Sequence, residues 1–93
     1  MSFLGNFFSV DPEVYLNKGR SCEISGKTKQ AAIYYELAAK KGNAEGMFLL
    51  ALIYLGLDTS FSEYHQAEGL ITKAAELGHG EAVDFLKNRS ITK

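Results

Sequence analysis

The chain has 93 residues and a mass of 10.2 kDa, which is enough for one small domain and too little for two separate cores. Apolar residues make up 46% of it and charged residues 23%, a composition typical of a folded globular protein rather than a disordered one. Ten basic and eleven acidic side chains leave a net charge of −1, so the composition shows no bias toward nucleic acid or an anionic membrane surface.

Residues 1–10 are predicted to form an apolar N-terminal arm, followed by a helical domain over residues 11–93. The arm lacks a positively charged region and a small-residue cleavage site, so a secretory signal is not indicated, and no apolar run is long enough to cross a bilayer. With one unpaired cysteine, Cys22, the chain is expected in the cytoplasm. Two interpretations of the arm remain open: it covers part of its own chain, or it anchors a partner or a second copy. The side chains concerned are Phe3, Leu4, Phe7 and Phe8.

Helix signals follow one another along the rest of the chain. Asp11-Pro12-Glu13 is typical of a helix start, because Asp caps, proline suits the first turn and an acid suits the helix dipole. Further on, apolar residues recur at helical spacing, and no segment alternates as a strand would. The segments predicted as helices are 12–24, 28–41, 44–56, 63–77 and 80–89.

The chain repeats itself with an offset of 36 residues. When Lys29–Leu50 is laid over His65–Leu86, seven of the 22 positions are identical. Gly42 and Gly78 are one such pair, and each falls where a glycine would end a helix. A repeat of this length indicates stacked helical units. We therefore predict an all-α protein, a short right-handed α-solenoid of antiparallel helix pairs whose last helix is a cap.

Two stretches resemble a known family. Residues 44–54, AEGMFLLALIY, resemble the first helix of the SEL-one-like repeat, and residues 64–67 and 73–79, YHQA and KAAELGH, resemble its second helix. The junction between helices is repeated at residues 40–45. The resemblance covers about residues 12–87 and implies about two repeats of this branch of the tetratricopeptide superfamily. The chain departs from the family pattern at Gly46, where the family has alanine, and at Ala51, where it has a packing glycine.

The resemblance also implies where a partner binds, because tetratricopeptide-like solenoids use the concave face lined by the first helix of each pair. Independently, the helix predicted over 44–56 is apolar nearly all round, so it is either buried on every side or meets a partner. Its centre is predicted to be apolar, with charged flanks on the neighbouring helices. The predicted concave positions are Glu13, Leu16, Arg20, Phe48, Leu52, Leu55, Glu81, Asp84 and Asn88.

No pattern of catalytic residues occurs in the sequence. His65 and His79 are predicted to be structural or solvated, since no acidic cluster accompanies them, and Cys22 to be a small buried apolar residue. We therefore expect neither an enzyme nor a metal or cofactor site. The expected function is a non-enzymatic protein–protein interaction module, acting as adaptor, scaffold or inhibitor, that holds a protein or peptide in the concave groove. Two alternatives are an immunity-type inhibitor of a bacterial toxin and a self-associating unit, a homodimer through the arm.

Overall fold

The computed structural model describes residues 10–56 and 61–91, and within these ranges it is all-α. The all-α prediction is therefore confirmed. The helices predicted over 28–41 and 63–77 differ from the observed ones by only one or two residues at their ends. The helix predicted over 80–89 extends two residues further, to Ile91. The helices are α2 (Pro12–Ile24), α3 (Thr28–Lys40), α4 (Ala44–Gly56), α5 (Phe61–Glu76) and α6 (Gly80–Ile91).

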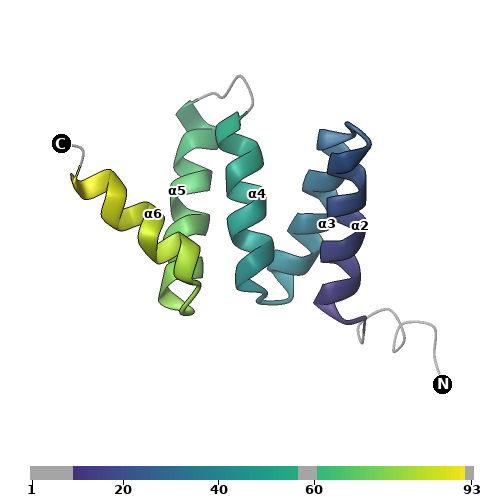
Figure 1. Ribbon diagram of the computed structural model, residues 1–93, viewed down its shortest axis with the longest axis horizontal. Helices are drawn as coiled ribbons and strands as arrows, with labels where there is room; N and C mark the ends of the chain where they lie inside the picture. Colours follow the sequence, from purple (N-terminus) through teal and green to yellow (C-terminus); the bar gives the residue numbers. More distant parts are fainter. Residues whose placement is uncertain (1–9, 57–60, 92–93) are drawn as a thin grey trace.

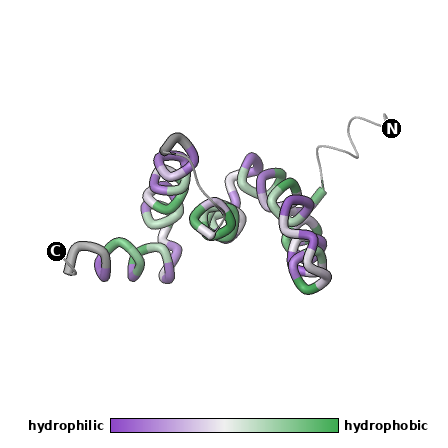
Figure 2. The backbone as a smooth tube through the Cα atoms, turned by 90° about the horizontal axis from the view of Figure 1, so that it is seen from above, coloured by the Kyte–Doolittle hydropathy of each residue, from purple (hydrophilic) through white to green (hydrophobic). Residues whose placement is uncertain are grey.

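Each helix packs against its neighbours in the chain, so the molecule is a row of antiparallel helices and a short helical solenoid (Figure 1). Seen from above, α2, α4 and α6 lie toward one side of the row and α3 and α5 toward the other (Figure 2). We call the two sides the even-helix face and the odd-helix face. No helix among the described residues has both the length and the apolar character needed to span a membrane.

The repeated glycines end α3 and α5 in the same way. Gly42 has a φ of +86° and Gly78 a φ of +92°, a left-handed conformation that glycine adopts without steric cost. After α3, the N–H of Asn43 donates to the carbonyl of Ala38, and the corresponding bond follows α5. These are the hydrogen bonds of a Schellman turn, so the predicted function of both glycines as helix ends is confirmed.

Each even-numbered helix starts with a capping side chain at the residue before its first turn, and two of these residues, Asn43 and His79, occupy the same position of the repeat. Asp11 accepts a hydrogen bond from the backbone N–H two residues on, at 2.9 Å. Asn43 and the Nδ1 atom of His79 accept from the N–H three residues on, at 2.7 and 3.1 Å. Asp, Asn and His are equivalent here because each presents an acceptor to the free N–H groups of the first turn.

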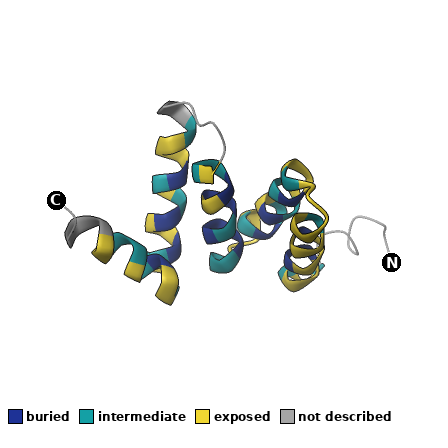
Figure 3. Ribbon diagram, turned by 45° about the horizontal axis from the view of Figure 1, so that its top comes forward, coloured by how far each residue is buried: buried dark blue, intermediate teal, exposed yellow. Residues whose placement is uncertain are grey.

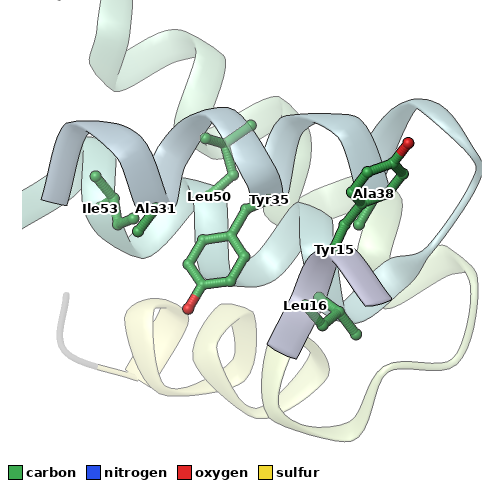
Figure 4. Packing of buried hydrophobic residues seen from close by; sticks show 7 residues of the cluster. All are labelled: Tyr15, Leu16, Ala31, Tyr35, Ala38, Leu50 and Ile53. Carbon is green, nitrogen blue, oxygen red and sulfur yellow. The ribbon is translucent and has the colours of Figure 1, made fainter. Parts of the chain in front are cut away.

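The first core cluster joins α2, α3 and α4 around Tyr35, which is fully buried (Figure 4). A Cβ atom at Gly19 would lie within 3 Å of this ring, so the glycine lets α2 approach α3 closely. The phenol of Tyr35 donates to the carboxylate of Glu23 at 2.5 Å. Burial, and then this hydrogen bond to a carboxylate, raise the pKa of Tyr35 above its ordinary value of 10.

The second cluster joins α4, α5 and α6. Figure 3 shows buried residues running through α4 and along the sides of the helices that face it. Gly46 brings α4 close to α3, because a Cβ at this position would lie 2.8 Å from the Cβ of Ala38. Glycine rather than alanine at this position therefore has a packing reason. The buried members of the cluster are Met47, Phe48, Ala51, Ala67, Ile71, Ala74 and Ala82.

Candidate partner-binding surface

The even-helix face carries most of the positions predicted to bind a partner. Leu55 is half-buried, and two predicted positions are buried: Leu16 with 2% of its surface exposed and Phe48 with 6%. The prediction that Leu16 and Phe48 line an open groove is therefore wrong. The predicted positions that are exposed are Glu13, Arg20, Leu52, Glu81, Asp84 and Asn88.

Leu16 is buried because α2 turns its apolar side toward α3. Tyr15, Leu16 and Gly19 form that side, and Leu16 joins the cluster around Tyr35 (Figure 4). Consecutive residues lie about 100° apart around a helix, so the buried side of α2 is wide enough to include both Tyr15 and Leu16.

Phe48 is buried because the chain returns over the first half of α4. The ring of His79, in the turn before α6, lies over the ring of Phe48 with centroids 4.8 Å apart and planes inclined by 34°. Ala82 of α6 belongs to the same buried cluster. The turn before α6 and the start of α6 therefore cover the side of α4 that carries Phe48.

A chain of polar contacts crosses the even-helix face beside Phe48. The guanidinium of Arg20 donates to Oε2 of Glu45 at 2.8 Å, and Nη1 of Arg20 lies 4.0 Å from the carboxylate of Glu13. The other oxygen of Glu45 lies 2.5 Å from Nε2 of His79, whose side chain is only 13% exposed. These polar contacts therefore connect α2, α4 and the start of α6 to one another.

The carboxylates of Glu45 and Glu81 and the ring of His79 offer ligand atoms within 4.8 Å of one another. The sequence argument that no acidic cluster accompanies this histidine is therefore wrong. Nδ1 of His79 accepts a hydrogen bond from the N–H of Ala82, so in the neutral ring the proton is on Nε2, which donates to Glu45. A metal on Nε2 would require a proton on Nδ1, facing the N–H of Ala82. The arrangement of Glu45, His79 and Glu81 therefore fits a hydrogen-bonded contact between helices better than a metal site.

The other candidate side chains of the sequence are accounted for separately. His65 is exposed on α5, with Nδ1 3.9 Å from the carboxylate of Glu68. Cys22 is half-buried and packs against the first core cluster, as a small apolar residue would. The predicted arm residues Phe3, Leu4, Phe7 and Phe8 lie outside the described residues.

Two turns along α4 from Glu45, the even-helix face becomes apolar. Leu52 is 40% exposed, and Leu49 and Leu55 lie half-buried on either side of it. Ile24, at the end of α2, is 88% exposed. A small cavity of about 270 Å³ opens beside Leu52, and its other lining residues are Glu23, Thr28, Ile53 and Gly56.

Sequence reasoning missed a second surface, a groove on the odd-helix face between α3 and α5. Its floor includes Met47 and Leu50, which the sequence pattern marks only as core residues. Gly69, a glycine in the middle of α5, is the one sequence signal on its wall.

The fold and these surfaces were compared with known proteins. Neither protein-family models, nor curated proteins, nor solved structures include a match to this chain.

Proposed function

We propose that the chain is a non-enzymatic protein-interaction module of the SEL-one-like type, with its contact surface on the even-helix face around Leu52. The observation that carries this proposal is the exposure of Leu52 on a helix that α3 and α5 otherwise bury. An isolated exposed leucine is ordinary, but here Leu49 and Leu55 extend the apolar surface along α4, beside a cavity. Contiguous apolar surface bordered by charges is typical of protein contact sites.

The chemistry of the surface indicates what a partner presents. An apolar side chain would pack on Leu52 and enter the cavity beside it, and its neighbours would meet a charged border. On that border Arg20 and Glu45 already satisfy each other at 2.8 Å, so they orient a partner more than they add affinity. The binding free energy would therefore come chiefly from the apolar anchor.

The SEL-one-like assignment has its own support. The helix-ending glycine, the capping residue and the glutamate two residues later occur in register at both junctions between units, at 42–45 and 78–81. At both junctions the glycine ends the preceding helix and the capping side chain accepts a hydrogen bond from the first turn of the next one. The same junction is the part of the chain that resembles the family pattern most closely.

Photo-cross-linking in cells of the native host tests the proposal. Benzoylphenylalanine replaces Leu52 in one variant and Ile33 in a matched control, since Ile33 is 57% exposed on α3 of the odd-helix face. We expect a specific adduct at position 52, and at least about a tenfold loss of that partner's affinity in Leu52→Asp but not in Ile33→Asp, because burying a leucine contributes about 1.5–3 kcal/mol.

Equal labelling at both positions, or labelling at position 33 alone, would contradict the proposed surface. An adduct with the mass of two copies of the chain would instead favour the self-associating alternative. Circular dichroism of each variant establishes that the helices are retained.

A further inference from the structure

The groove on the odd-helix face has a volume of about 450 Å³ and runs between α3 and α5, with α4 beneath it. Its apolar lining comes from Met47, Leu50 and Tyr54 of α4 and Leu70 of α5. Lys40, which lies 3.9 Å from the carboxylate of Glu36, stands at one wall and Lys73 at the other. At Gly69 the wall formed by α5 is open, since a Cβ there would meet nothing within 4 Å. The described helices therefore leave an apolar channel between two lysine-bearing walls.

We propose that residues 1–9 of the same chain lie in this groove. They contain no charged side chain, and Phe3, Leu4, Phe7 and Phe8 give them four large apolar groups to place on its floor. The aromatic rings also suit the walls, because an ammonium group is attracted to the face of an aromatic ring.

The position of Val10, which follows residues 1–9, brings the groove of the same chain within their reach. Val10 is half-buried and packs against the first core cluster, and Leu50 belongs to that cluster and also lines the groove. The segment therefore has to pass one helix, α3, which is about 10–12 Å across with its side chains. Nine residues reach about 30 Å when extended. A short tether gives a millimolar effective concentration, which favours the segment's own groove over that of a second copy.

The even-helix face is a poorer place for this segment. To reach Leu52 from Val10, residues 1–9 would have to cover the paired charged side chains of Glu13, Arg20 and Glu45. Covering charged groups with apolar side chains removes their hydration without replacing it. Because the groove lies on the opposite face, this inference stands independently of the proposed function.

Disulfide trapping tests the inference directly. In a Cys22→Ala background, Phe7→Cys is combined with Gly69→Cys, which the open space at that position accommodates, or with Leu52→Cys as the matched control. Under mild oxidation at low protein concentration, we expect the 7/69 pair to close at least about tenfold faster than the 7/52 pair, because a docked thiol has the higher effective concentration. The product should have the mass of one chain, at a rate independent of dilution.

Equal closure rates for the two pairs, or faster closure of the 7/52 pair, would overturn the inference. A disulfide-linked dimer whose rate falls on dilution would overturn it in favour of a second copy. A further measurement needs no cysteine. In the unaltered chain, NMR should detect contacts between the rings of Phe3, Phe7 or Phe8 and the methyl groups of Leu70, and contacts of these rings with Leu52 in their place would contradict the proposed location.

Discussion

At the scale of single residues, two glycines inside helices differ in the space that an added side chain would find. Gly46 lies where α3 and α4 approach most closely: besides the Cβ of Ala38, an added Cβ would lie 3.1 Å from the backbone carbonyl oxygen of Tyr35. Gly69 lies on the exposed side of α5 with no neighbour for an added Cβ. Composition and periodicity treat the two alike, because each is a helix-weakening residue in an otherwise regular pattern.

The same substitution at these two positions should therefore change stability in opposite directions. We expect Gly69→Ala to raise the free energy of unfolding by about 0.5–1 kcal/mol, because alanine loses less backbone entropy in a helix. Gly46→Ala should lower it by about 1–3 kcal/mol, because backbone atoms must move to admit the new methyl group. Urea unfolding followed by circular dichroism measures both. A stabilised Gly46→Ala variant would contradict the close packing of α3 and α4.

At the scale of helices, the side chain of Tyr35 connects α3 to α2. Its ring occupies the space that Gly19 leaves open, and its hydroxyl reaches Glu23 near the end of α2. One side chain of α3 therefore contacts α2 at Gly19 and again at Glu23.

This contact predicts a loss of stability in alkali. The pKa of Tyr35 is raised in the folded chain, so above about pH 10 the unfolded chain releases a proton that the folded chain retains. The unfolding free energy should then fall with rising pH, by at most about 1.4 kcal/mol per pH unit for this group. Tyr35→Phe should lessen that fall and cost about 1 kcal/mol at pH 7. Chemical denaturation from pH 7 to 11 tests this, and parallel curves for the two proteins would refute it.

The helices and their ends were largely predictable because their signals are local. A capping Asp at residue 11, glycines 36 residues apart and apolar positions at helical spacing each act within one or two turns. The exposure of individual side chains was less predictable. Leu16 depends on the rotation of α2 about its axis, and Phe48 depends on His79, which is 31 positions away in the chain. Contacts of that kind arise from packing and leave no local pattern.

At the scale of the whole molecule, the row of helices makes an elongated body. It measures 54 × 28 × 23 Å and has a radius of gyration of 14.1 Å, whereas a compact domain of this length has about 12 Å. Since each helix packs chiefly on its neighbours in the chain, the stability of the row is close to a sum of adjacent contacts. An end helix can then open while the rest stays folded.

His79 gives a means of opening α6 selectively. His79→Asn should keep the cap, as Asn43 does for α4, and lose the hydrogen bond to Glu45, whereas His79→Ala should lose both. A hydrogen bond to a carboxylate contributes about 1.5–3 kcal/mol and a cap about 1 kcal/mol.

Hydrogen exchange measured by NMR distinguishes these effects. Amides of α6 should exchange about tenfold faster or more in the Asn variant, and faster again in the Ala variant, with amides of α3 little changed. Equal exchange in both variants would show that the cap contributes nothing. A matching increase in α3 would show that the row unfolds only as one unit.

The shared cap position also makes the repeat interchangeable. The segment 44–79 begins after one capping residue, Asn43, and ends with the next, His79, so an in-frame duplication of it would create no new kind of junction. Within each copy, the glutamate at the start would meet the histidine at the end. The junctions themselves would therefore not limit a change in the number of units, and each added unit would carry another copy of Leu52.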